Sequence, residues 1–108
     1  MISLQNRYPL KSPLVASRLI DGEAVIIIPQ DNEVKVLNEV GSRIWELLDG
    51  QRDMINLSAL IAGEFDVSPD QALEDITEFI ADLWGRKMVV LHDRPPVDAE
   101  TQQRQPLK

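Results

Sequence analysis

The chain has 108 residues, no cysteine, one histidine and a net charge of −7 at pH 7. This length suits one domain with a single hydrophobic core, and the absence of cysteine excludes disulfides, iron–sulfur ligation and thiol catalysis. The acidic balance opposes non-specific binding to nucleic acid, whose phosphates attract lysine and arginine, and it suits either a basic partner or solubility alone.

The N-terminal segment shows no helical or strand-like period. Residues 1–13 contain two prolines and are expected to form an extended arm. The first residues lack the charged-then-apolar layout of a secretory signal, so we expect a cytoplasmic protein. The longest apolar run, residues 24–28, is too short to cross a bilayer, and we expect no membrane partner.

Residues 14–37 predict a three-stranded antiparallel sheet. The dipeptide Asp21-Gly22 separates the expected strands 14–20 and 23–28 and favours a tight hairpin turn. The β-branched run in the second strand indicates a central position or burial on both faces. Polar and apolar residues alternate from Glu33 to Leu37, which predicts a third strand with one wet face.

Three helical patterns follow. Asn38 is the expected N-cap of the first helix, which should end near Gly50, and the second helix should begin near Asn56. The third helix has the clearest start, because Ser68 is an N-cap and Gln71 completes a capping box.

A short strand over residues 88–91 is expected to close the domain, which spans residues 14–92. Residues 93–108 lack an apolar period and are expected to form a disordered tail. The order of elements indicates an α+β fold, in which a winged helix-turn-helix of three helices is preceded by the three-stranded antiparallel sheet.

Several stretches of the chain are similar to a known family. The most specific block is Leu37-Asn38-Glu39 followed by Ile44-Trp45-Glu46-Leu47-Leu48-Asp49-Gly50. Weaker matches are Asp21-Gly22-Glu23-Ala24, Phe65-Asp66-Val67, Asp75-Ile76, Phe79-Ile80 and Leu83. Over residues 14–92 the chain resembles the coenzyme-PQQ synthesis protein D family, the peptide-recognition elements of ribosomal peptide modification pathways.

This resemblance implies the winged helix-turn-helix with its three-stranded sheet. It also implies a function, namely binding the leader region of a precursor peptide and presenting it to a modifying enzyme, often a radical S-adenosylmethionine (SAM) enzyme. Family members serve quinone cofactor synthesis and lasso peptide synthesis, among other pathways. The motif alone does not assign the chain to one of them.

The chain offers few groups for catalysis. Its single histidine, His92, has no second histidine and no cysteine to complete a metal site, and no glycine-rich phosphate loop occurs. The carboxylates fall on expected helix exteriors, where solvation explains them. We therefore expect no enzymatic activity, no metal and no cofactor. Residues 64–82 carry acidic but no basic side chains, which disfavours a DNA-reading helix and a nucleic-acid partner.

The expected binding site combines a strand edge with the third helix. The last strand of the meander can leave one edge open, to which a peptide strand can add through main-chain hydrogen bonds. The resemblance implies this mode, with the third helix as the other wall. That helix has a wide apolar stripe, so one flank can line a groove, although both flanks can equally be core. The expected peptide-binding residues are Glu33, Val34, Lys35, Val36, Leu37, Leu73, Ile76, Ile80 and Trp84.

Other residues keep two interpretations. Asn38 is favoured as a helix cap over a peptide contact, and Trp45 as core over a binding platform. Asp75 fits either a hydrogen bond to a neighbouring turn or a partner contact. The alternative function is a winged-helix regulatory or scaffold domain that binds a protein partner, with DNA less favoured. The open edge also allows a strand-exchanged homodimer.

Overall fold

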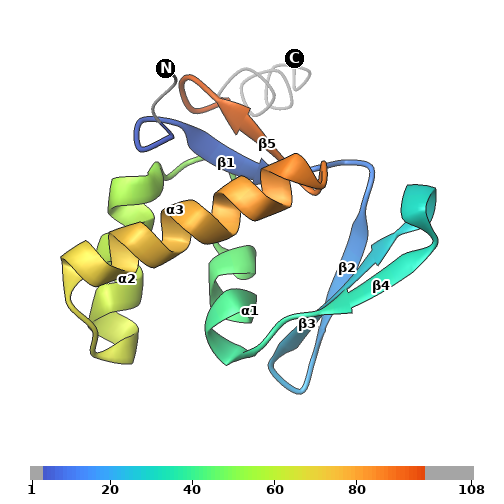
Figure 1. The fold of residues 1–108 in the computed structure, drawn as a ribbon, viewed down its shortest axis with the longest axis horizontal. Coiled ribbons are helices and arrows are strands. Elements are labelled where there is room, and N and C mark those ends of the chain that lie inside the picture. Colours follow the sequence, from blue (N-terminus) through green and yellow to red (C-terminus); the bar gives the residue numbers. More distant parts are fainter. Residues whose placement is uncertain (1–3, 97–108) are drawn as a thin grey trace, which may run out of the picture.

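The computed structural model describes residues 4–96 and arranges them as a three-stranded sheet, three helices and a separate pair of strands (Figure 1). The elements in chain order are β1 (Tyr8–Lys11), β2 (Ala16–Ile20), β3 (Glu23–Ile28), a 3₁₀ turn (Pro29–Asp31), β4 (Glu33–Val36), α1 (Glu39–Glu46), α2 (Met54–Phe65), α3 (Pro69–Gly85) and β5 (Val89–His92). Four strands precede the three helices and one follows them, an order typical of α+β folds.

The sheet is a meander in the order β2–β3–β4, so β3 is central. Asp21 and Gly22 take φ values of 53° and 83° in the β2–β3 turn, which explains why this dipeptide predicts the hairpin. Ala24 and Ile26 of β3 are buried, whereas Ile27, which points to the opposite face of the sheet, is exposed. The strand is therefore buried on one face only, and burial on both faces is the wrong alternative.

The first two helices begin at capping side chains. The Asn38 side chain accepts the backbone N–H of Gly41 at 2.8 Å, which confirms the predicted N-cap of α1. α1 ends well before Gly50, which has a φ of 80° and forms part of the following turn. α2 begins before Asn56, because Asp53 accepts the Asn56 N–H at 2.9 Å and acts as the N-cap.

The start of α3 follows the sequence closely. The Ser68 hydroxyl accepts the backbone N–H of Gln71 at 3.1 Å, which confirms this N-cap. The Gln71 side-chain amide donates to Asp75 at 2.9 Å. It is thus engaged within its own helix, and only the Ser68 half of the predicted capping box is formed.

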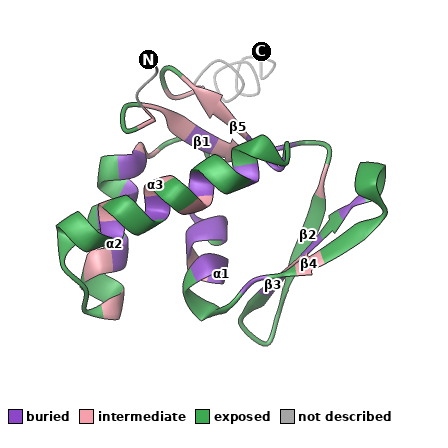
Figure 2. Ribbon diagram, viewed as in Figure 1, coloured by how far each residue is buried: buried purple, intermediate pink, exposed green. Residues whose placement is uncertain are grey.

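The core lies between the helices and the inner face of the sheet, where the buried segments of Figure 2 converge. Its members are apolar side chains: Ala24, Ile26, Ile28, Leu37, Ile44, Trp45, Leu47, Leu48, Met54, Leu57, Ile61, Ile76, Ile80, Leu83, Met88 and Val89. Trp45 is buried and its indole N–H donates to the Ser17 hydroxyl at 3.0 Å. The favoured interpretation of Trp45 as a core residue is therefore confirmed.

The two ends of the described chain meet in a second sheet. β1 pairs antiparallel with β5, with Tyr8 opposite His92. Part of the expected N-terminal arm is thus a strand, and the closing strand lies one residue later than predicted. Asp93 of the expected tail forms an ion pair with Arg7 at 3.2 Å, and residues 97–108 lie outside the described residues.

Within residues 4–96, the strand after α3 therefore pairs with the N-terminal strand, whereas the strands of a wing follow each other and form one hairpin. The architecture shown is α+β, with three helices and a three-stranded antiparallel sheet.

Candidate functional site

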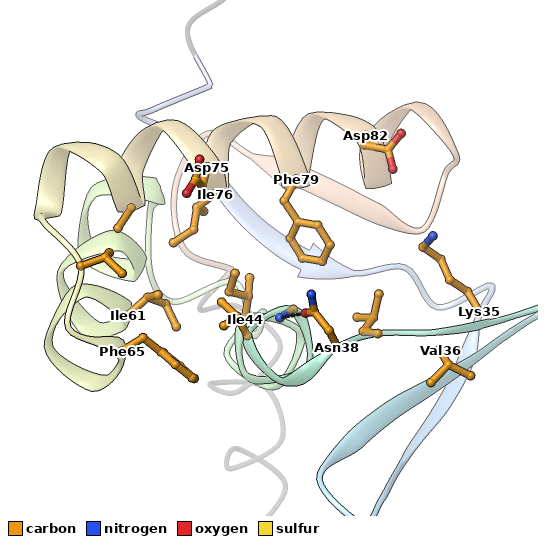
Figure 3. A pocket seen from close by; sticks show the side chains of 15 residues that line it. Lys35, Val36, Asn38, Ile44, Ile61, Phe65, Asp75, Ile76, Phe79 and Asp82 are labelled. Carbon is orange, nitrogen blue, oxygen red and sulfur yellow. Dashed lines mark hydrogen bonds between the residues drawn. The ribbon is translucent and has the colours of Figure 1, made fainter.

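A groove of about 610 Å³ lies between α3 and the segment that joins β4 to α1 (Figure 3). Its lining comes from β4, all three helices and the connections beside them: Lys35, Val36, Leu37, Asn38, Val40, Gly41, Ile44, Ile61, Phe65, Val67, Ala72, Asp75, Ile76, Phe79 and Asp82. Most of these side chains are apolar, so the groove can bury apolar side chains of a ligand.

Phe79 is the largest α3 side chain in the groove. In Figure 3 its ring points from α3 toward Asn38 and Ile44 on the opposite side. A Cβ atom on Gly41 would lie 3.5 Å from the Phe79 ring and 3.1 Å from the Asn38 side-chain oxygen. Glycine at this position therefore leaves room for the ring and the cap in the same corner of the groove.

The β4 strand has one open edge among the described residues, because only β3 pairs with it. The Leu37 N–H donates to the Ala24 carbonyl at 3.0 Å, so these two residues face each other as a hydrogen-bonded pair. Such pairs alternate along an antiparallel ladder, which directs the backbone groups of Lys35 toward β3 as well. The N–H and C=O groups of Val34 and Val36 consequently point away from β3, toward the open edge.

The β4 side chains alternate between two faces of the sheet. Lys35 and Leu37 lie opposite core-facing residues of β3 and so point to the helix side. Val34 and Val36 point to the other face, where they are 61% and 55% exposed. The edge therefore offers a ligand free backbone groups, flanked by an apolar surface on one side and the groove on the other.

The structure brings together only part of the predicted site. Of the predicted residues, Lys35, Val36, Leu37 and Ile76 line the groove. Glu33 and Val34 belong to the same strand but lie outside the groove lining.

The structure places the predicted residues on the other flank of α3 outside the groove. Ile80 is 0% exposed and belongs to the core, and neither Leu73 nor Trp84 lines the groove. Trp84 is 43% exposed elsewhere on α3. The reason is that α3 turns the opposite flank of its apolar stripe, which carries Ala72 and Phe79, toward β4.

Sequence reasoning missed the groove residues of α1 and α2, and on α3 it missed Ala72, Phe79 and Asp82. Phe79 and Ala72 were visible as one flank of the apolar stripe, but the pattern does not say which flank the sheet approaches. Asp82 resembles any other solvated carboxylate in the sequence. Its place in the groove follows from lying one helical turn beyond Phe79 on the same side of α3.

The charged groups of the groove differ in how they are engaged. Asp75 accepts a hydrogen bond from the Gln71 amide at 2.9 Å, and Asp82 forms an ion pair with Arg86 at 3.4 Å. Asp75 thus makes the turn-to-turn bond that was one of its two interpretations. Lys35 is half-buried, and its ammonium has no hydrogen-bond or ion-pair partner within residues 4–96.

One ion pair joins α1 to α2 next to the groove. Arg43 of α1 donates to both carboxylate oxygens of Glu64 on α2, at 2.9 and 3.0 Å. These hydrogen bonds hold the pKa of Glu64 below its ordinary value. The pair fastens α1 to α2 beside the groove but does not line it.

Two kinds of feature are absent from the part of the chain that the structure describes, namely a metal site and a membrane-spanning helix. No group of three or more His, Cys, Asp or Glu side chains in residues 4–96 converges to hold a metal ion. None of the helices described is long and apolar enough to span a bilayer. What the site presents is an open strand edge, an apolar groove and one half-buried cation.

The sequence model of the family described as Coenzyme PQQ synthesis protein D (PqqD) matches residues 23–89, which is more than half of the chain. The chain belongs to the PqqD family. The resemblance recognised in the sequence is thereby confirmed. A curated relative named PqqA binding protein, from Rhizobium meliloti (strain 1021), is 26% identical over 70 residues, which cover 65% of this chain and 69% of the relative.

Solved structures of other proteins share this fold. One, described as TbiB1 in complex with the TbiA(beta) leader peptide, is 29% identical with a TM-score of 0.69, and the match covers 74% of this PqqD-family chain and 93% of that chain. A lasso peptide synthetase B1 complexed with the leader peptide is 18% identical with a TM-score of 0.69, covering 77% and 98%.

A third structure shows the same fold at lower identity. It is the solution structure of the PqqD truncation of Methylobacterium extorquens PqqCD, described as a functional, stand-alone recognition element for ribosomally synthesized and post-translationally modified peptides. It is 17% identical with a TM-score of 0.67, and the match covers 83% of this chain and 95% of that one.

Proposed function

We propose that this chain binds the leader region of a ribosomally made precursor peptide and presents it to a modifying enzyme. The observation that carries the proposal is the open edge of β4 beside an apolar groove. The relatives support it, since one is named for binding PqqA and the 29% identical structure is a complex with a leader peptide. The enzyme that receives the peptide is a radical SAM enzyme or another peptide maturase.

The binding mode is strand addition. A leader strand lying antiparallel to β4 meets the outward N–H and C=O groups of Val34 and Val36, and each hydrogen bond so formed contributes roughly 0.5–1.5 kcal/mol net. Every second leader side chain then points to the helix side, into the groove against Leu37, Ile76 and Phe79. The backbone supplies affinity that is independent of sequence, and the groove supplies selectivity.

The proposed site is thus revised from the sequence expectation. Glu33, Val34, Lys35, Val36 and Leu37 remain in it as the edge strand and its continuation. On α3 the site keeps Ile76, and Phe79 takes the place of the residues on the opposite flank.

We infer that the chain acts as a binding domain without catalysis or cofactor, in the cytoplasm where precursor peptides are made. We also infer that the three helices and the β1–β5 pair correspond to a winged helix-turn-helix, with β1 in the place of the second strand of a wing. The acidic residues of α3 disfavour DNA as a ligand.

Calorimetric titration with the leader of a precursor peptide encoded beside this gene tests the proposal. One peptide should bind per chain, and a scrambled peptide of the same composition should bind much more weakly. A second copy of the chain can also occupy the β4 edge, so the titration is paired with a measurement of oligomeric state. A monomeric chain that binds neither peptide would contradict the proposed function.

A further inference from the structure

We propose that the groove selects a leader strand in which an acidic residue follows two positions after an apolar one, and that Lys35 pairs with the acidic residue. This inference rests on the proposed strand addition and names the class of peptide that the site accepts. It follows from the hydrogen-bond register of β4 and from the charges that line the groove.

The register decides which leader residues enter the groove. Because Val34 and Val36 direct their backbone groups outward, the leader residues opposite them exchange hydrogen bonds with β4 and point to the exposed face of the sheet. The leader residues opposite Lys35 and Leu37 point to the helix side. In an antiparallel strand the residue opposite Leu37 comes first, and the residue opposite Lys35 comes two positions later.

The two inward positions meet different surroundings. The first lies at Leu37, where Phe79 and Ile76 provide an apolar subsite. The second lies directly across from Lys35, and side chains of such non-hydrogen-bonded pairs have Cβ atoms about 4.5–5.5 Å apart. Figure 3 shows the Lys35 ammonium directed toward α3, at the end of the groove where Asp82 lies. The first position therefore favours an apolar side chain and the second a charged or polar one.

The sign of that charge follows from which groove residues already have partners. Asp82 is paired with Arg86, and Asp75 accepts from Gln71, so both carboxylates are engaged within α3. Lys35 is the groove cation left without a partner among residues 4–96. A carboxylate of the leader completes a pair with it, whereas a basic residue at the same position would face Lys35 at close range.

Selection from a displayed library of short random peptides tests this inference. The unmodified protein should enrich an apolar–x–acidic pattern. The Lys35→Glu variant should enrich apolar–x–basic, and Lys35→Gln should lose the preference at the last position. In anisotropy titrations with one enriched peptide, changing its acidic residue to lysine should weaken binding to the unmodified protein by roughly five- to tenfold, and this ratio should shrink as salt is added.

Lys87→Glu is the matched control, because it changes the net charge equally and Lys87 is exposed outside the groove. This variant should select the same pattern as the unmodified protein. Peptides that bind every variant with one unchanged charge preference would overturn the role of Lys35 while leaving strand addition intact. Failure of the unmodified protein to enrich any peptide would count against strand addition itself, and this inference would fall with it.

Discussion

The buried hydroxyl of Ser42 accepts the backbone N–H of Ala24 at 2.7 Å. The same hydroxyl donates to the Leu37 carbonyl at 3.1 Å, while the Leu37 N–H donates to the Ala24 carbonyl at 3.0 Å. In a regular ladder the Ala24 N–H and the Leu37 carbonyl would bond each other, and here the hydroxyl bridges them. The first turn of α1 is thereby joined to both strands at the point where the open edge meets the groove.

Ser42→Ala should destabilise the fold by about 1–3 kcal/mol, because it leaves a buried N–H and a buried carbonyl without their partner. Urea unfolding followed by circular dichroism measures the loss. Ser58→Ala is the control, since Ser58 is also buried but donates only to the Met54 carbonyl of its own helix, at 2.7 Å. Its loss should be clearly smaller. Equal stabilities for the two variants would show that the Ser42 hydroxyl does not stabilise the contact between α1 and the two strands.

The two faces of α3 should respond differently to truncation. Ile80→Ala should lower the free energy of unfolding by about 2–5 kcal/mol, because Ile80 is fully buried. Phe79→Ala should leave the domain folded and weaken leader binding by about 1–2 kcal/mol, because this half-buried ring lines the groove. Unfolding and calorimetric titration of both variants give the comparison. Unchanged leader affinity in a folded Phe79→Ala variant would remove Phe79 from the site.

Proline substitution distinguishes the outward from the inward N–H groups of β4. Val36→Pro removes an N–H that points to the open edge, so it should weaken leader binding more than it weakens the sheet. Lys35→Pro removes an N–H directed at β3 and should destabilise the sheet itself. Both changes impose the same restriction on φ, so each controls for the other. Chemical unfolding and leader titration together report the two effects. If the two prolines destabilise the fold alike, the assignment of the Val36 N–H to the open edge and of the Lys35 N–H to β3 is wrong.

Local features were predictable from the sequence because they depend on neighbouring residues. The caps at Asn38 and Ser68 and the Asp21-Gly22 turn are formed by side chains or φ values within one turn of the chain. The same holds for the meander, whose strands are joined by short turns. β1 could not be predicted in this way, since its pairing partner β5 lies at the other end of the domain.

The site was predictable in kind but not in detail. The last strand of a meander has an open edge, and that inference needs only the order of the strands. The choice between the two flanks of α3 needs the direction from which β4 approaches the helix. That direction is set by contacts such as the one between Ser42 and Ala24, which lie far from α3 in the sequence. The apolar period of α3 therefore shows where the stripe lies and not which flank stays open.

Amide hydrogen exchange at β4, measured with and without the leader peptide, shows whether a peptide strand adds to this edge. In the free protein the N–H groups of Val34 and Val36 should exchange fast, while that of Lys35 should exchange slowly because it faces β3. On leader addition, Val34 and Val36 should become protected and Lys35 should change little. A leader that binds tightly while Val34 and Val36 continue to exchange at their free rates would contradict strand addition at this edge.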